Sequence, residues 1–340
     1  MKTMPEIHQR VVLAARPAGM PSGSDFRIEQ SPLPEPASGQ ILIRVLYLSV
    51  DPYMRGRMRD AASYAAPVQI GEVMMGGGVG KVTASRSDKF AVGDYVEGVT
   101  GWQTHVVTDG RGYRKLDPSL APVSTALGVL GMPGLTAYFG LLDICHPKPG
   151  ETVLVSGAAG AVGSLAGQIA RIQGCRAVGI AGGDDKVRWL TGELGFDAAF
   201  NYKTVTDYRA AIAGLCPNGV DVYFDNVGGP ITDAVMGLIN LKARISVCGQ
   251  ISQYNNERTE LGPRLLFHLI VKRARMEGFL VTDYAPRFRE GLTQMAQWLR
   301  EGKLQYREQI EHGIENTAGA FIAMMKGANT GKMLVRIAED

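Results

Sequence analysis

The chain has 340 residues, of which 45% are hydrophobic and 20% charged, and its formal net charge at pH 7 is +3. This length favours two domains, and the composition is that of an ordinary globular protein. The small net charge argues against a nucleic-acid partner. Because no stretch approaches the roughly 20 apolar residues of a membrane span, we expect no membrane partner either.

The first ten residues show no apolar core of a signal peptide. The four cysteines form no C-x-x-C pair; they are Cys145, Cys175, Cys216 and Cys248. A catalytic thiol would need a histidine and an orienting group to which the sequence does not point, so we interpret all four as buried thiols. We therefore expect a cytoplasmic protein with reduced cysteines.

Residues 1 to about 125 consist of short extended runs that are separated by turn residues. Such runs lie at 40–50, 76–85, 92–100 and 104–110, and the pattern predicts a β-rich region. The glycine-rich run at 75–80 lacks the Lys-Ser or Lys-Thr of a P-loop, and we interpret it as a tight strand.

From about residue 130 to 300 strands alternate with helical segments, which predicts a doubly wound parallel sheet. The expected strands cover 152–157, 176–182, 220–229 and 243–251, and the expected helices cover 162–174, 185–195 and 231–240. After about residue 305 the pattern is mixed again and ends in a strand-like segment.

The segment VLVSGAAGAVGSLAGQIA, residues 153–170, predicts a strand, a glycine-rich turn and a helix. Gly160 would let the backbone approach a pyrophosphate, and Gly163 would let the helix pack close to the strand. Ala158 stands where the usual dinucleotide fingerprint has its first glycine, so a structural tight turn is the alternative. The strand–helix–strand setting favours dinucleotide binding, with the phosphates at the helix N-terminus.

The end of the second strand, AGGDDKVRWL, bears on the choice between NAD and NADP. Gly182 and Gly183 leave room for a 2′-phosphate that Lys186 could bind. Asp184 and Asp185 complicate this interpretation, although both residues suit the start of a helix, and Lys186 could be an ordinary surface lysine. These residues favour NADP over NAD only modestly.

Several motifs together resemble the zinc-independent medium-chain dehydrogenase/reductases. They are LSVDPYMRGRM, SGAAGAVGSLAGQIARIQGCRAVGIAG, ELGFDAAFNYKT, GVDVYFDNVGG, VCGQISQYN and GANTGKMLVR. The resemblance runs from about residue 8 to the end. It is narrowest to the group of prostaglandin reductases, leukotriene hydroxydehydrogenases, plant 2-alkenal reductases and bacterial curcumin reductases.

The resemblance implies an α/β fold with two domains. A GroES-like β-rich catalytic domain would cover 1–128 and 305–340, and a Rossmann NADP-binding domain would cover 129–304. It also implies a homodimer, and NADPH-dependent reduction of the C=C bond of small α,β-unsaturated ketones and aldehydes. In that reaction hydride goes to the β-carbon and the enolate is protonated. A quinone oxidoreductase and a non-catalytic NADPH-binding protein are the alternatives.

The family motifs also imply residue roles. Those implied for cofactor binding are Gly160, Ala161, Val162, Gly163, Lys186, Tyr202, Asn226, Cys248, Gly249, Ile251, Ser252, Tyr254, Phe279, Leu280, Val281 and Asn329. Asn226 could instead be an ordinary turn residue after a strand. Tyr254 is the first candidate for proton donation or contact with the enolate, followed by Tyr53 and Tyr64, although a loop tyrosine often serves packing alone.

The sequence predicts no metal site. The five histidines are scattered, the stretch at 71–80 holds none, and the cysteines form no cluster of the kind that binds zinc.

Overall fold

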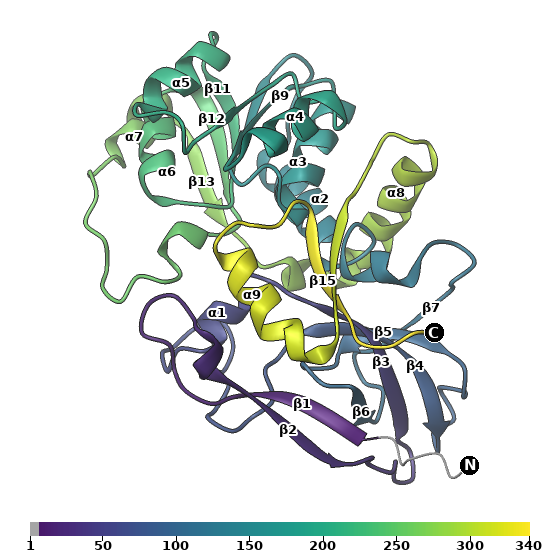
Figure 1. Cartoon of the computed structure of the whole chain (residues 1–340). Helices are drawn as coiled ribbons and strands as arrows, with labels where there is room; N and C mark the ends of the chain where they lie inside the picture. The colour runs from purple at the N-terminus through teal and green to yellow at the C-terminus, as the bar shows by residue number, and fades with distance from the viewer. Residues whose placement is uncertain (1–6) are drawn as a thin grey trace. The chain divides into compact units, whose positions relative to one another are not determined.

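The structure is a computed structural model that describes residues 7–340. The first six residues, which begin the segment considered above for a signal peptide, lie outside the described residues. The chain divides into two compact units. Unit 1 comprises 1–127, 308–329 and 333–340, and unit 2 comprises 128–307 and 330–332. Each unit contains its own sheet (Figure 1).

Unit 1 is β-rich, as the sequence predicts. Strands β1 and β2 pair antiparallel, and a seven-stranded sheet runs β14-β15-β3-β4-β5-β7 with β6 on β3. The strands are β1 (Ile7–Leu13), β2 (Phe26–Pro32), β3 (Ile41–Ser49), β4 (Gly77–Ser85), β5 (Tyr95–Val99), β6 (His105–Thr108), β7 (Arg114–Leu116), β14 (Glu308–His312) and β15 (Lys332–Arg336). Two helices belong to this unit, α1 (Met54–Arg57) and α9 (Thr317–Met325).

The glycine-rich run at 75–80 leads into β4 and forms a strand, in agreement with the sequence interpretation. A Cβ on Gly78 would lie 2.2 Å from Thr100 Oγ1, and one on Gly80 would lie 2.4 Å from the Arg44 carbonyl oxygen. Side chains therefore do not fit there, and the glycines serve close packing.

Unit 2 contains a six-stranded sheet in the order β10-β9-β8-β11-β12-β13, and each neighbouring pair is parallel. The strands are β8 (Thr152–Val155), β9 (Arg176–Ala181), β10 (Ala198–Asn201), β11 (Val220–Asp225), β12 (Ile239–Val247) and β13 (Arg275–Gly278). The strand order reverses direction between β8 and β11, as in a Rossmann fold, and this confirms the predicted fold class.

Helices cover both faces of this sheet (Figure 1). One buried core joins the sheet to α2, α3, α4 and α8, and a second joins it to α5, α6 and α7. The helices are α2 (Met132–Cys145), α3 (Ala161–Ile172), α4 (Asp184–Gly192), α5 (Tyr208–Leu215), α6 (Gly229–Met236), α7 (Phe267–Lys272) and α8 (Phe288–Arg300). No helix within residues 7–340 has the length and apolar character that a membrane crossing requires.

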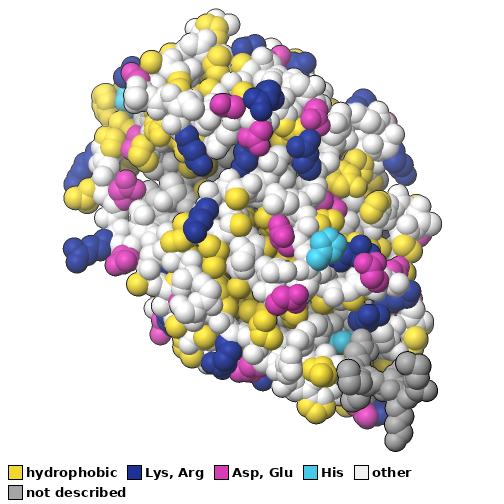
Figure 2. Space-filling model, viewed as in Figure 1, with side chains coloured by type: hydrophobic (Ala, Val, Ile, Leu, Met, Phe, Trp, Pro, Cys, Tyr) yellow, Lys and Arg dark blue, Asp and Glu magenta, His cyan; other side chains and the backbone are white. Residues whose placement is uncertain are grey.

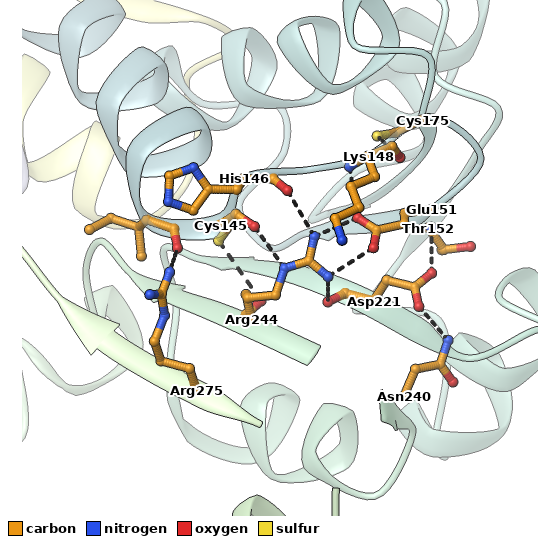
Figure 3. A network of polar contacts seen from close by, with 11 residues as sticks. Cys145, His146, Lys148, Glu151, Thr152, Cys175, Asp221, Asn240, Arg244 and Arg275 are labelled. Carbon is orange, nitrogen blue, oxygen red and sulfur yellow. Dashed lines mark hydrogen bonds and ion pairs between the residues drawn. The ribbon is translucent and has the colours of Figure 1, made fainter. Parts of the chain in front are cut away.

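The amino-terminal edge of the unit 2 sheet is held by Arg244 (Figure 3). Its Nε donates to the Cys145 carbonyl at 2.7 Å and its Nη2 to the His146 carbonyl at 3.1 Å, so it caps the C-terminal end of α2. The same guanidinium makes a bidentate ion pair with Glu151, with distances of 3.0 and 2.5 Å. This network therefore lies at the amino-terminal ends of the parallel strands, whereas the predicted cofactor residues follow their carboxyl ends.

The structure also differs from the expected elements. The helix predicted over 231–240 ends at Met236, followed by Gly237, and β12 already begins at Ile239. The short strands β10 and β13 had no counterpart among the predicted strands.

Candidate cofactor site

The predicted glycine turn lies between β8 and α3. Gly160 precedes the first helical residue, and within the described chain no side chain caps this helix start. The amides of Ala161, Val162 and Gly163 lie at the positive N-terminal end of α3, which suits a pyrophosphate. A Cβ on Gly163 would lie 2.4 Å from the Gly157 carbonyl oxygen, so only glycine allows α3 to pack this closely. These residues fit a dinucleotide phosphate group.

Lys186 and Tyr202 follow the carboxyl ends of β9 and β10, respectively. The Tyr202 ring lies against Gly182, where a Cβ would be 2.8 Å from Tyr202 Cε1. Lys186 is half-buried in the first turn of α4, and burial lowers its pKa, an effect that Asp185 opposes and Lys203 reinforces. Asp184, the residue that complicated the cofactor choice, accepts a hydrogen bond from Asn201 Nδ2 at 2.8 Å. A half-buried cation beside two glycines fits a 2′-phosphate.

The loops after β11 and β12 lie against each other. The Ile251 amide donates to the Asn226 carbonyl at 3.3 Å, and the Ser252 hydroxyl donates to the Val227 carbonyl at 2.6 Å. Asn226 Nδ2 donates to the Ser156 carbonyl at 2.7 Å, so part of its side chain secures the glycine turn. Asn226 therefore joins the loop after β11 to the loop after β8, and its assignment to the cofactor ribose stays a prediction.

Cys248 and Gly249 connect β12 to this cluster of loops, and both amides donate to the Asp225 carbonyl, at 2.8 and 3.1 Å. Burial raises the pKa of the Cys248 thiol to about 12. A thiol of this kind stays protonated at neutral pH and does not act as a nucleophile. The other three cysteines are buried as predicted, whereas Cys248 is only partly buried.

Tyr254 ends the short helical turn Ile251–Gln253, which follows β12. Its side chain folds back over the loop, because the Gln250 amide donates to the Tyr254 hydroxyl oxygen at 3.2 Å. An N–H aimed at this oxygen stabilises the negative charge that remains when the phenol gives up its proton. Tyr254 is therefore held at the carboxyl edge of the sheet with its oxygen supported by the backbone.

The remaining residues predicted to bind the cofactor lie in two other segments. Phe279 and Val281 pack partly buried against the core beside α2, where a Cβ on Gly140 would be 2.4 Å from Phe279 Cζ, and Leu280 lies between them. Asn329 precedes the segment 330–332, which pairs with the glycine turn: the Gly331 amide donates to the Ala159 carbonyl at 2.8 Å.

Tyr53 and Tyr64 belong to unit 1, unlike Tyr254. Tyr64 is 60% exposed, and its ring stacks on Arg57, with the guanidinium carbon 4.4 Å from the ring centre. Burial raises the pKa of Tyr53, and the neighbouring Asp51 and Tyr64 raise it further while Arg57 lowers it. Tyr53 thus remains a neutral hydroxyl donor at physiological pH, and Tyr64 is close enough to influence it.

Two residues with clear structural importance here were missed by the sequence reasoning. Asp225 and Ser156 are both buried, and their side chains hydrogen-bond to each other at 3.0 Å beneath the loops. The available signal was a polar residue at the end of each of two buried strands, in VLVS and VYFD.

Comparison with known protein families matches both units. Residues 9–116 match the model described as the N-terminal domain of oxidoreductase, and residues 161–299 match the model described as zinc-binding dehydrogenase. An NADPH-dependent curcumin reductase of Escherichia coli is 46% identical over 98% of both chains. The chain belongs to the medium-chain dehydrogenase/reductase family.

Other members of this medium-chain dehydrogenase/reductase family are equally similar along the chain. An NADP(+)-dependent 2-alkenal reductase of Nicotiana tabacum is 44% identical over 98% of both chains. The crystal structure of CurA from Vibrio vulnificus in complex with NADPH superposes with a TM-score of 0.94 and 48% identity, over 98% of this chain and all of that one. The family and fold expected from the motifs are thus confirmed.

The second family model mentions zinc in its description. Within residues 7–340, however, no group of three or more histidine, cysteine, aspartate or glutamate side chains is arranged to hold a metal ion. The residues of this medium-chain dehydrogenase/reductase therefore do not fit a zinc centre of the kind that needs several such ligands.

Proposed function

We propose that this protein reduces the C=C double bond of α,β-unsaturated ketones and aldehydes. It is an NADP-dependent oxidoreductase, as its relatives are. The names of those relatives support the substrate class, since 2-alkenals are α,β-unsaturated aldehydes. The single observation that carries the proposal is the arrangement at the carboxyl ends of the unit 2 strands, where a glycine turn follows β8, a half-buried lysine follows β9 and a backbone-supported tyrosine follows β12.

The cofactor residues are part of this proposal. Gly160 to Gly163 would bind the pyrophosphate, Lys186 and Tyr202 the 2′-phosphate end, and Asn226 the ribose. The segment from Cys248 to Tyr254 would line the cofactor, Phe279 to Val281 would border the nicotinamide and Asn329 would hydrogen-bond to it. When bound, the reduced cofactor supplies a hydride to the β-carbon of the substrate.

Tyrosines would manage the charge that develops on the substrate. As the β-carbon is reduced, negative charge gathers on the carbonyl oxygen, and a positioned hydroxyl donor lowers the barrier most at that point. Tyr254 would donate this hydrogen bond and then the proton. Tyr53 and Tyr64 are the candidates for the substrate side in unit 1.

We further propose that two copies associate through the α7–β13 edge of unit 2. β13 is the last strand of its sheet, and within residues 7–340 no further strand pairs with its outer side. Leu266, Phe267 and Ile270 in and before α7 are 69–72% exposed, and Figure 2 shows apolar side chains gathered where Figure 1 places α7. An open strand edge beside exposed apolar side chains favours a second protein chain as partner. A cytoplasmic location, with reduced cysteines, completes the proposal.

The decisive experiment measures NADPH consumption against a panel of 2-alkenals, enones, curcuminoids and quinones, with identification of the products. We expect saturated ketones and aldehydes from the enals and enones. Rapid turnover of quinones alone would instead indicate a quinone oxidoreductase, and NADPH binding without consumption would indicate a non-catalytic protein. Light scattering of wild-type and Phe267→Glu protein tests the dimer, which the charged variant should dissociate.

A further inference from the structure

Asp225 ends β11 with a side chain that is 1% exposed, and it collects hydrogen bonds from several segments. Its Oδ2 accepts from Thr232 Oγ1 at 2.7 Å. Its Oδ1 accepts four hydrogen bonds between 2.9 and 3.0 Å; the donors are Ser156 Oγ, Tyr223 OH and the amides of Val227 and Gly228. A buried carboxylate normally costs stability, and this one is compensated by five donors.

The donors come from the loops that the candidate cofactor residues occupy. Ser156 opens the glycine turn after β8, and its hydroxyl accepts from the Asn226 amide at 2.9 Å. The backbone carbonyl of Asp225 accepts from the amides of Cys248 and Gly249. One residue therefore links the ends of β8, β11 and β12, which carry the phosphate turn, Asn226 and the Tyr254 loop.

The negative charge matters to this arrangement. One oxygen that accepts four hydrogen bonds is best served by a carboxylate, because bonds to a charged acceptor are about twice as strong as neutral ones. In an asparagine the remaining oxygen would be neutral. The NH2 group would stand in place of Oδ2, which now accepts from the Thr232 hydroxyl, and an NH2 group cannot accept that hydrogen bond. Since the Asp225 side chain is buried, it acts on a ligand only through the loops that it holds.

We propose that Asp225 is a positioning residue for the NADPH site: its carboxylate sets the glycine turn through Ser156 and the loop after β11 through the amides of Val227 and Gly228. The proposal rests on the cofactor location given above. It predicts a specific coupling: once the bond between Asp225 and Ser156 is weakened or removed from one side, a change of the other partner adds less than its full loss.

The test measures NADPH binding by calorimetry, well below the unfolding temperature, for Asp225→Asn, Ser156→Ala and the double variant. We expect each single variant to weaken binding about tenfold or more, and the double variant to weaken it by clearly less than the product of the two. Turnover at saturating NADPH should fall less than affinity. Thr232→Val, which removes the donor from α6 alone, is the matched control and should keep wild-type affinity.

Three results would overturn the proposal: wild-type affinity in folded Asp225→Asn, fully multiplicative losses in the double variant, or an equal loss in Thr232→Val. If Asp225→Asn does not fold, Ser156→Ala decides, because unchanged NADPH affinity in that variant contradicts the proposed route. A further variant, Gly163→Val, distinguishes a failure of this proposal from a wrong cofactor location. If Gly163→Val binds NADPH normally, the proposed cofactor location is wrong. If Gly163→Val loses NADPH affinity while Asp225→Asn keeps it, only the positioning role of Asp225 is contradicted.

Discussion

The ring of Tyr202 lies over Gly182, with a separation that leaves no room for even a methyl group on the glycine. This contact brings the end of β10 against the end of β9, directly before the helical turn that carries Lys186. The proposed 2′-phosphate site is therefore formed by the ends of β9 and β10 and the start of α4. Residues in each of the three can be substituted separately.

Lys186→Ala should raise the Michaelis constant for NADPH by about tenfold or more, because one charge-assisted contact to the phosphate is lost. The constant for NADH, which has no 2′-phosphate, should hardly change. Steady-state kinetics with both cofactors measures this difference. Equal use of the two cofactors by the wild-type protein would contradict the assignment.

The same lysine predicts a pH dependence. Burial lowers the pKa of Lys186, so its charge is lost at lower pH than that of an ordinary lysine. The Michaelis constant for NADPH should therefore rise on the alkaline side as pH passes through that pKa, while the constant for NADH stays level. A pH profile of Lys186→Ala serves as control and should lack this rise.

Tyr254→Phe keeps the ring and its packing and removes the hydroxyl that accepts from the Gln250 amide. We expect turnover of enones to fall on the order of a hundredfold, the usual effect of removing one donor from a preorganised site. NADPH affinity should change little, and quinone reduction should be less affected. Turnover at the wild-type rate would eliminate Tyr254 and direct attention to Tyr53 and Tyr64.

Gly163→Val tests the glycine turn. Even the Cβ would clash with the Gly157 carbonyl oxygen, so α3 must move away from β8. Both the melting temperature and the affinity for NADPH should fall. Gly192→Ala, in open space at the end of α4, is a suitable control and should change neither.

We expect activity without a metal ion, because the residues at 7–340 bring together no three His, Cys, Asp or Glu side chains that could hold one. Prolonged chelation should leave activity unchanged, and elemental analysis should find no stoichiometric zinc. Activity that disappears on chelation and returns with added zinc would refute this prediction.

Arg244→Met should destabilise the protein by about 2 kcal/mol or more, because it removes the charged partner of the half-buried Glu151 carboxylate and a donor to the carbonyl at the end of α2. Burial alone would raise the pKa of Glu151, but the Arg244 hydrogen bonds bring it below its usual value. The stabilisation is therefore present above the unfolded-state pKa and is lost as pH falls through the folded one. Unfolding curves at neutral and acidic pH measure it, and NADPH affinity should stay unchanged.

Much of unit 2 could be predicted from the sequence, because buried strands such as 152–155 and 220–225 have apolar runs that are followed by glycine-containing turns. The strand β13 could not, since RMEG is short and charged and becomes a strand only by pairing with β12. The same limit applies to Asp225. The sequence pattern placed it in a strand over 220–229, whereas its importance comes from the donors around its carboxylate, of which Ser156 is 69 residues away and meets it only in the folded chain.

The segment 330–332 belongs to unit 2, although the residues on either side of it belong to unit 1. Gly331 pairs with Gly160 at the glycine turn and has a positive φ of 71°. A fragment cut at residues 128 and 307 would therefore contain the whole parallel sheet and still lack the segment that pairs with its glycine turn. Chimeras that exchange unit 2 between relatives must take this three-residue segment with it. A chimera with a single crossover would combine the glycine turn of one parent with the 330–332 segment of the other.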